Sequence, residues 1–296
     1  MRKLIFLIFI QSLLFWSHCS NQNRMLTPLP YFNQPAPGLK PELFAPGFFS
    51  NQDFVLHGFP TFSPDGKEVY WPVVPPKVLW MEYVDHQWSS PQIAPFSEGN
   101  IQAACFSQDG SKLFFQLYDS TGYGDLDMWF VEKIDSAWSP KINIGSSPNS
   151  SKMESQPSVA KNGTVYFTGS LDNVTWNRGI YRSEYQNGKY LPPEVLPPSI
   201  NTEFIDYTPF IAPDESFLLF ASTRPTHDEE DIRIYVSFRK KNNTRSEPVN
   251  LNEVMDFNQP SRFPSLTPDG KFMIFLSKGE YYWVSSEVIE KCREGN

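Results

Sequence analysis

A fivefold internal repeat constrains this chain more than any other feature. Each copy has a short apolar run, a turn built on Pro-Asp-Gly or a close variant, and a second run of β-branched and aromatic residues. The copies span 60–71, 104–115, 157–167, 209–220 and 264–275. The residues before the turns, Ser63, Ser107, Ala160, Ala212 and Thr267, are spaced by 44, 53, 52 and 55 positions. Such a period predicts an array of similar supersecondary units.

Each unit is predicted to be a four-stranded antiparallel sheet. Turns of this kind join paired strands, because Gly permits a positive φ, Asp and Asn bond their own backbone, and Pro presets φ. A third, aromatic-rich strand follows at 78–83, 126–131, 179–183, 232–237 and 281–285. A fourth segment that contains proline ends the first four units, at 87–93, 137–142, 189–195 and 245–249. Proline suits an outer edge strand, so each unit has the pattern of a β-propeller blade.

The fifth unit lacks its fourth strand, because the chain ends soon after Ser285. The stretch 41–48 aligns with 193–200, which surrounds the outer strand of the third unit. We therefore expect Glu42-Leu43-Phe44 to pair on the outside of the last sheet and close the ring, which removes exposed strand edges. The prediction is an all-β fold, a five-bladed β-propeller over residues 41–290. A six-bladed ring that uses 21–40 and the C-terminal tail is the alternative.

Composition excludes several classes of protein. The chain is 40% hydrophobic and 16% aromatic, enough to build a large core and to exclude general disorder. Its net charge of −8 argues against nucleic acid as a partner, because phosphate binding needs clustered Lys and Arg. Beyond Cys19, only Cys105 and Cys292 remain, which predicts no disulfide framework, no metal site and no cofactor. We expect Cys105 to be a buried, inert thiol and Cys292, near the charged C-terminus, to be open to solvent.

Residues 1–19 have the pattern of a secretory signal peptide. Arg2 and Lys3 precede an apolar run, 4–16, that is short for a membrane span, and polar residues follow at once. Two interpretations of Cys19 stay open. It is the lipidated residue of a bacterial lipoprotein, although His18 precedes it where a small residue is usual, or an ordinary signal peptidase cuts after it. Both predict export to the periplasm or cell surface, with 20–40 as a flexible tether and 291–296 as a tail.

Several motifs carry a resemblance to a known family. The Ser-Pro-Asp-Gly-Lys strands, together with Ser222-Thr-Arg224, 231–235 and 246–251, resemble the WD-like repeat of the TolB β-propeller superfamily. The turns at Asn162-Gly163 and Asp214-Glu215 depart from the usual pattern. The resemblance implies a monomeric interaction domain of the bacterial envelope that binds a protein, peptide or glycan and reaches the membrane only through its N-terminal lipid anchor.

The mouth of the central channel is the natural binding site of a propeller. Two aligned columns of residues enter the innermost strands: His57, Ile101, Glu154, Asp206 and Ser261, followed by Gly58, Gln102, Ser155, Tyr207 and Arg262. The neighbouring turns do not require the polar residues of these two columns. We predict that six of them surround one cavity that binds a polar ligand or peptide: His57, Gln102, Glu154, Asp206, Tyr207 and Arg262. A mouth filled only by water is the alternative.

A second function class, an extracytoplasmic glycoside hydrolase, would use Glu154 and Asp206 as its paired carboxylates. Such a pair needs one protonated and one ionised acid at a defined separation, which the sequence does not give. The turn residues Asp65, Asp109, Asp214 and Asp269 are instead expected to be structural. We also expect Arg224 to form an ion pair with Asp231 inside the fourth blade.

Overall fold

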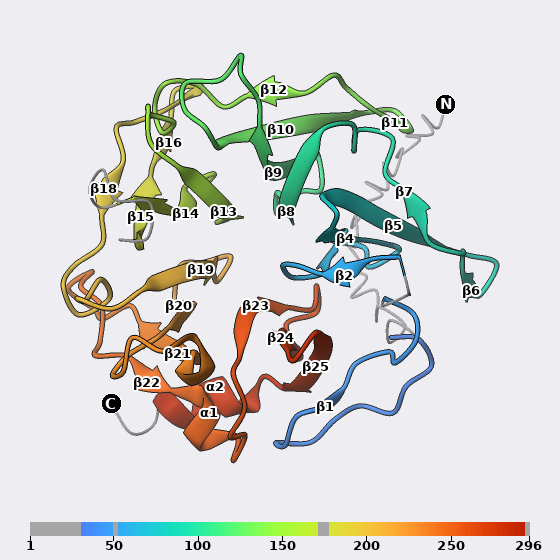
Figure 1. Ribbon diagram of the computed structural model, residues 1–296. Coiled ribbons are helices and arrows are strands. Elements are labelled where there is room, and N and C mark those ends of the chain that lie inside the picture. Colours follow the sequence, from blue (N-terminus) through green and yellow to red (C-terminus); the bar gives the residue numbers. More distant parts are fainter. Residues whose placement is uncertain (1–30, 50–52, 171–177, 294–296) are drawn as a thin grey trace, which may run out of the picture. The chain divides into compact units, whose positions relative to one another are not determined.

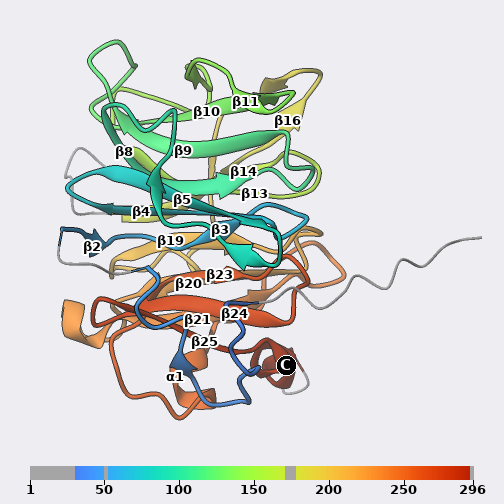
Figure 2. The same ribbon diagram turned by 90° about the vertical axis from the view of Figure 1, so that its right-hand side faces the viewer.

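Five antiparallel sheets stand around a central axis (Figure 1). The computed structural model describes residues 31–49, 53–170 and 178–293, and these residues form the predicted five-bladed β-propeller. The predicted signal peptide and Cys19 lie outside the described residues. Seen from the right-hand side of Figure 1, neighbouring blades stack face to face (Figure 2).

In blades 1 to 4 the strands follow one another along the chain from the axis outwards. Blade 1 contains β2 (Val55–Leu56), β3 (Thr61–Phe62), β4 (Glu68–Val74), β5 (Lys77–Val84), β6 (Gln87–Trp88) and β7 (Gln92–Ile93). Blade 2 contains β8 (Asn100–Phe106), β9 (Lys112–Tyr118), β10 (Asp127–Ile134), β11 (Ala137–Trp138) and β12 (Ile142–Asn143). Blade 3 contains β13 (Glu154–Val159), β14 (Val165–Ser170), β15 (Arg178–Ser183) and β18 (Glu194–Val195), beside the hairpin of β16 (Tyr185–Gln186) and β17 (Lys189–Tyr190).

Blades 4 and 5 carry the helical segments of the described chain. Blade 4 contains β19 (Asp206–Ile211), β20 (Phe217–Ser222), β21 (Arg233–Phe238) and β22 (Val249–Asn250). Blade 5 contains β23 (Arg262–Leu266), β24 (Phe272–Ser277), β25 (Glu280–Ser285) and β1 (Glu42–Leu43). The helical segments are the 3-10 turn η1 (Glu229–Asp231), α1 (Leu251–Val254) and α2 (Glu287–Arg293).

The N-terminal strand closes the ring as predicted. In β1, Glu42 lies opposite Trp283 of β25, and Leu43 lies opposite Tyr282. The Phe44 backbone N–H then donates to the Tyr281 carbonyl at 2.8 Å. In Figure 1 the blue segment that carries β1 runs along the outside of the red blade. The last sheet therefore takes its outer strand from the start of the folded chain, and no sixth blade forms among the described residues.

Polar side chains organise the repeated turns. The Ser63 hydroxyl donates to Asp65 Oδ1 at 2.6 Å and accepts the Glu68 backbone N–H at 2.9 Å. Ser107 with Asp109 and Thr267 with Asp269 repeat the first contact, each at 2.7 Å. In blade 4, Asp214 accepts the Ser216 backbone N–H at 3.0 Å. These acidic residues are structural, as expected, because they hold the turn between the first two strands of a blade.

The folded part begins earlier than the predicted boundary at residue 41. Tyr31 is buried, meets Phe62, Phe272 and Trp283 edge-on, and donates from its hydroxyl to Asp269 at 2.9 Å. The part of the predicted tether from Tyr31 to Lys40 therefore belongs to the compact unit that contains the propeller. Aromatic burial of this kind outweighs the chain entropy that a tether would keep.

The C-terminus also differs from the prediction. Helix α2 extends into the segment expected to be a tail, and it buries Val288, Ile289 and Cys292 against the last two blades. The Cys292 thiol is therefore buried and not open to solvent. Cys105 is buried as predicted, and burial raises the pKa of its thiol to about 11, so it stays protonated at neutral pH.

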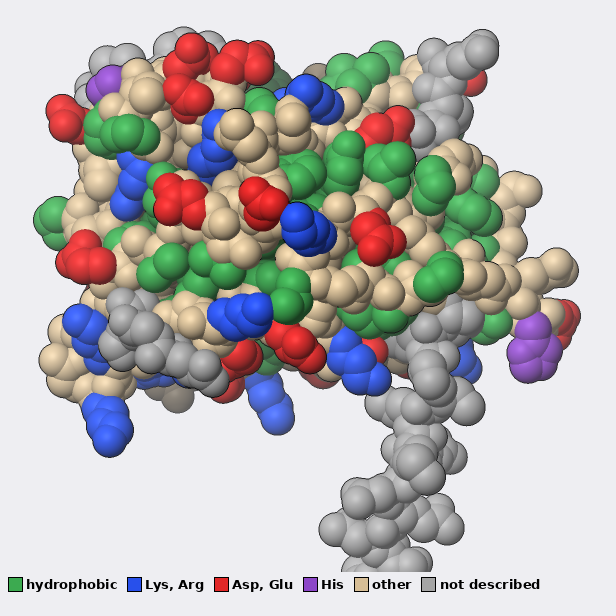
Figure 3. All heavy atoms as spheres, turned by 90° about the horizontal axis from the view of Figure 1, so that it is seen from below, with side chains coloured by type: hydrophobic (Ala, Val, Ile, Leu, Met, Phe, Trp, Pro, Cys, Tyr) green, Lys and Arg blue, Asp and Glu red, His purple; other side chains and the backbone are tan. Residues whose placement is uncertain are grey.

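The outer surface of the propeller is mixed in charge. On the face seen from below Figure 1, acidic and basic side chains are interspersed, with apolar side chains between them (Figure 3). Within the described ranges, no helix has the length and apolar character needed to cross a membrane.

Candidate functional site

A β-bulge interrupts the innermost strand of four blades. The register shifts after Gln102, Ser155, Tyr207 and Arg262. The next residues, Ala103, Gln156, Thr208 and Phe263, have positive φ values of 50°, 53°, 51° and 56°. A bulge of this kind re-aims the neighbouring side chain. The bulge recurs at equivalent positions in four blades that surround one axis (Figure 1), and residues beside it line a common cavity.

In blade 1, a glycine with positive φ stands at the corresponding position. Gly58 has φ of 115°, and a Cβ added to it would lie 2.5 Å from Pro72 Cγ. Any other residue would be strained in backbone and in space at this position. Because glycine has no side chain, the preceding residue, His57, supplies the blade's contribution to the channel.

These strands surround a cavity of about 200 Å³ at the channel mouth, lined from all five blades. Four of the six predicted site residues line it together: His57, Gln102, Tyr207 and Arg262. The cavity also contains residues that the sequence analysis did not single out, chiefly Gln116, Gln156, Arg178 and Glu229. Arg178 is the first residue of β15, the third strand of blade 3, and Glu229 lies in η1, which connects β20 to β21 in blade 4.

The structure does not bring Glu154 and Asp206 into this cavity. Both are buried, with exposed fractions of 5% and 0%. Glu154 accepts hydrogen bonds from the backbone N–H and the hydroxyl of Ser150. Burial raises the pKa of Glu154, and the bonds from Ser150 oppose that effect. Both carboxylates turn instead to the loops that precede their strands, where Ser150 donates to Glu154 and Thr202 donates to Asp206.

Asp206 is instead half of a buried ion pair. Its carboxylate accepts from Arg224 Nη2 at 2.6 Å, and from the backbone N–H and hydroxyl of Thr202 at 2.7 and 2.8 Å. The expected pair of Arg224 with Asp231 is wrong, since Asp231 faces Arg233 at 3.5 Å. Arg224 bridges Asp206 to the loop before β19, donating also to the Ile200 carbonyl at 2.7 Å. The ion pair therefore fixes the loop that leads into β19.

The electrostatics of the cavity favour an anion. Burial lowers the pKa of His57, and the positive charges of Arg262 and Arg178 lower it further, so the imidazole is neutral at pH 7. Burial raises the pKa of the Tyr207 hydroxyl, which keeps it protonated. Burial lowers the pKa of Arg178, with Glu229 among the groups that oppose the shift, and a guanidinium stays charged in proteins. The described lining thus carries two guanidinium groups against one carboxylate, Glu229.

An amide network borders the same cavity. Gln116 Nε2 donates to Gln102 Oε1 at 3.0 Å, and Gln116 Oε1 accepts the Gln156 backbone N–H at 2.9 Å. The network couples blades 2 and 3 and fixes the orientation of Gln102. The Gln156 side-chain oxygen is buried with no hydrogen-bond partner among the described residues. A ligand that brings a donor to this oxygen would satisfy it.

Among the described residues, the polar groups of the cavity do not form a cluster of metal ligands. The described residues contain no group of three or more His, Cys, Asp or Glu side chains that could hold a metal ion. The lining contains two guanidinium groups, a phenol and side-chain amides, which can donate hydrogen bonds, and the Glu229 carboxylate, which accepts them. Donors arranged around a small cavity recognise oxygen atoms, especially those that carry negative charge.

Comparison with solved structures places the fold. A protein described as TolB from Agrobacterium tumefaciens superposes with a TM-score of 0.52 at 17% identity, covering 75% of this chain and 70% of that one. The fold is that of a TolB-like β-propeller. TolB from Acinetobacter baumannii superposes with a TM-score of 0.48 at 13% identity. The superposition covers 76% of this chain and 52% of that protein. No protein-family model and no curated protein matches the chain.

The same fold occurs in an enzyme. A thermostable family-43 glycoside hydrolase superposes with a TM-score of 0.50 at 12% identity, covering 77% of this chain and 88% of that one. At such identities the likeness extends to the fold alone, and function has to be argued from the site.

Proposed function

We propose that this TolB-like propeller is a binding module of the bacterial envelope whose channel-mouth cavity accepts an anionic group of its ligand. One observation carries the proposal: Arg178 and Arg262 reach the same cavity from blades 3 and 5, beside the protonated hydroxyl of Tyr207. A volume of about 200 Å³ suits a single carboxylate, sulfate or phosphate group and its near surroundings. The partner is a protein, peptide or glycan that carries such a group.

Sulfate titration of the folded chain tests the site directly. We expect saturable binding that Arg262→Gln and Arg178→Gln each weaken about tenfold, because a hydrogen bond to a charged group contributes ~1.5–3 kcal/mol. Arg293→Gln, in α2 at the perimeter, removes one positive charge far from the channel and serves as the matched control. Unsaturable binding, or arginine variants at the channel that bind as the control does, would refute the anion site.

Capture from envelope extracts identifies the partner class. The wild-type propeller should retain a partner that the Arg262→Gln variant releases, and the Arg293→Gln variant should behave as the wild type. If all three proteins capture the same partner equally well, the interaction surface lies elsewhere on the propeller and the channel mouth is not the docking site.

The proposal includes export and anchoring through Cys19, which rest on the N-terminal sequence pattern. In a lipoprotein the wild-type chain should fractionate with membranes, and Cys19→Ser should appear in the soluble periplasmic fraction. Membrane retention of the Cys19→Ser variant would refute Cys19 as the anchor, and a wild-type chain in the soluble fraction would favour cleavage by an ordinary signal peptidase.

The glycoside hydrolase alternative is less well supported by the geometry. Glu154 and Asp206 are engaged by Ser150, Thr202 and Arg224, and neither lines the channel cavity. Hydrolysis needs two carboxyl groups that flank one bond, whereas the described lining holds only Glu229. We expect no turnover of a broad glycan panel. Turnover that Glu154→Gln abolishes in a folded protein would reinstate the enzyme.

A further inference from the structure

The gap between blades 1 and 2 is closed by a tryptophan. Trp138, on β11 of blade 2, donates from its indole Nε1 to the Tyr70 hydroxyl of blade 1 at 3.1 Å. Its ring also meets Phe96 and Phe106, with centroid separations of 5.7 and 6.1 Å. The hairpin of blade 2 thus covers the gap to the preceding blade, and the hydrogen bond holds the cover in place.

The next gap around the ring has smaller residues at the same positions. Tyr190 is paired in the blade 3 hairpin as Trp138 is in the blade 2 hairpin, with Tyr185 and Lys133 as their cross-strand partners. Phe114 occupies the place in blade 2 that Tyr70 occupies in blade 1. A Tyr-Phe pair has less volume than Trp-Tyr, and phenylalanine offers no hydroxyl to the hairpin.

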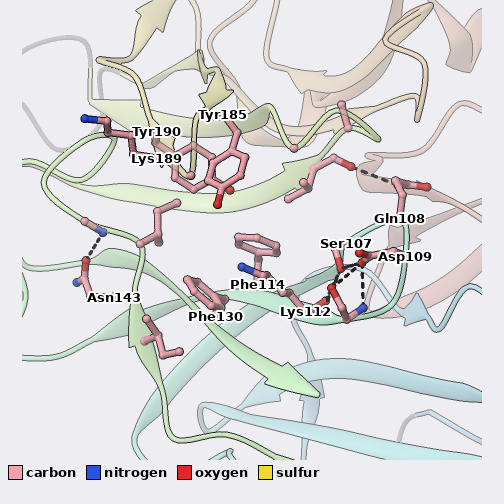
Figure 4. A pocket seen from close by; sticks show the side chains of 18 of the residues that line it. Ser107, Gln108, Asp109, Lys112, Phe114, Phe130, Asn143, Tyr185, Lys189 and Tyr190 are labelled. Atoms are coloured by element: carbon pink, nitrogen blue, oxygen red, sulfur yellow. Dashed lines mark hydrogen bonds between the residues drawn. The ribbon is translucent and has the colours of Figure 1, made fainter. Parts of the chain in front are cut away.

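A pocket of about 810 Å³ opens in this gap. The rings of Tyr185 and Tyr190 lie across it from those of Phe114 and Phe130 (Figure 4). Tyr185 and Tyr190 support each other with ring centroids 4.9 Å apart. The volume falls within the range of small-molecule sites, ~300–1,000 Å³, and aromatic walls are typical of such sites.

The rim of the pocket is positively charged in a chain whose net charge is −8. Lys112, Lys161 and Lys189 line it. Asp109 is the only acidic residue in the described lining, and its carboxylate already accepts from Ser107 and Ser111 in the turn. Lys112 is held over the Phe130 ring, 4.4 Å from the centroid, by an ion pair with Glu132. The pocket therefore combines apolar walls with a surplus of cationic groups at its edge.

We propose that the gap between blades 2 and 3 is a second binding site, for a small amphipathic molecule with a flat apolar body and one anionic group. The flat body lies between the tyrosine wall and the two phenylalanines, and the anionic group meets the lysines at the rim. The site lies at the outer side of the ring, shares no residue with the channel-mouth lining, and does not depend on the function proposed there.

Two fluorescent probes of one shape test the ligand class. Anilinonaphthalene sulfonate has an aromatic body and one negative charge, and phenylnaphthylamine has the same rings without the charge. We expect saturable one-site binding of the sulfonate, about fivefold tighter than that of the neutral probe. Arg293→Gln removes a positive charge that lines neither cavity and should leave sulfonate binding unchanged.

Two sets of variants locate the probe. Phe114→Tyr combined with Tyr190→Trp rebuilds the pair that closes the neighbouring gap, and should weaken sulfonate binding tenfold or more. Tyr83→Trp adds similar bulk to the blade 1 hairpin and is the matched control. Lys161→Gln combined with Lys189→Gln changes two exposed side chains, and should weaken binding of the sulfonate but not of the neutral probe.

Three results would overturn the proposal. The first is no saturable binding of the sulfonate to the wild-type protein. The second is unchanged binding to the Phe114→Tyr/Tyr190→Trp variant when its near-UV circular dichroism is native. The third is an equal effect of the lysine variant on both probes, which would show that the charge is not recognised. The test with the Lys161→Gln/Lys189→Gln variant does not depend on whether the Phe114→Tyr/Tyr190→Trp variant folds.

Discussion

At the scale of single residues, His57 contributes to the channel cavity an imidazole, which gains a positive charge as the pH falls. It lies against the Phe263 ring and faces the positive charges of Arg178 and Arg262 across the channel cavity. Each of these surroundings disfavours the imidazolium, so the pKa of His57 falls below its ordinary value of 6.5. An anion bound between the arginines would reverse part of this effect, because it would stabilise a third positive charge.

Sulfate binding should therefore strengthen as the pH falls through the pKa that His57 has in the sulfate-bound state, by at most about tenfold per pH unit because one proton is involved. In the absence of sulfate, stability changes in the other direction. The pKa of His57 is lower in the folded state than in the unfolded state. The stability that this difference contributes is present above the unfolded-state pKa and is lost as the pH falls through the folded-state pKa. Titrations from pH 7 to 5 measure both effects. His57→Gln should flatten both profiles, and an unchanged slope would exclude His57 as the titrating group.

The buried pair of Asp206 and Arg224 makes a second prediction at this scale. Asp206→Ala leaves Arg224, whose side chain is only 15% exposed, without its carboxylate, and should cost ~3–5 kcal/mol in the free energy of unfolding. Replacing both residues, as Asp206→Ala/Arg224→Met, should restore much of that loss. Denaturant unfolding measures it. Asp256→Asn, in the exposed pair with Lys40, removes the charge at a residue of positive φ that asparagine also tolerates, and as the control it should leave the midpoint unchanged.

At the scale of elements, the two-residue strand β1 contributes more than its length suggests. Its backbone pairs with β25, and the next residue, Phe44, is only 2% exposed. The Phe44 ring packs against Phe49 and Trp283, with centroid separations of 5.6 and 5.1 Å. Hydrogen bonds give the register of the closure, and this aromatic contact supplies most of its stability.

Phe44→Ala should lower the free energy of unfolding by ~3–5 kcal/mol, as expected for deleting a buried aromatic side chain. Leu43→Ala, one residue earlier and 41% exposed, should change it by less than about 0.5 kcal/mol. Thermal or denaturant unfolding measures the difference. Equal effects of the two substitutions would mean that the strand closes the ring through its backbone alone.

At the scale of the whole molecule, the ring joins the first and last described parts of the chain. Leu43 and Tyr282 lie directly opposite each other across the closure, although 239 positions separate them in the sequence. Antiparallel partners have Cα atoms about 4.5–5.5 Å apart, a separation that a disulfide can span. The two remaining native cysteines of the propeller are buried and so do not compete for the bond.

Leu43→Cys combined with Tyr282→Cys should form a disulfide under oxidising conditions and raise the free energy of unfolding by ~2–4 kcal/mol relative to the reduced form. Mass spectrometry of the unreduced protein and paired unfolding curves measure the bond and its effect. An open array of blades would keep the two thiols apart, so failure of the variant to oxidise would contradict the closed ring.

The number of blades, the strands in each and the closure follow from the repeat, because period, turn chemistry and strand alternation are local properties that every copy shares. Which polar residues meet depends on the folded arrangement of the strands. The bulge after Gln102, Ser155, Tyr207 and Arg262 turns one column towards the axis and leaves Glu154 and Asp206 behind it. The place of Arg178 and the open gap behind Phe114 depend on how separate blades pack, and no short stretch of sequence encodes that.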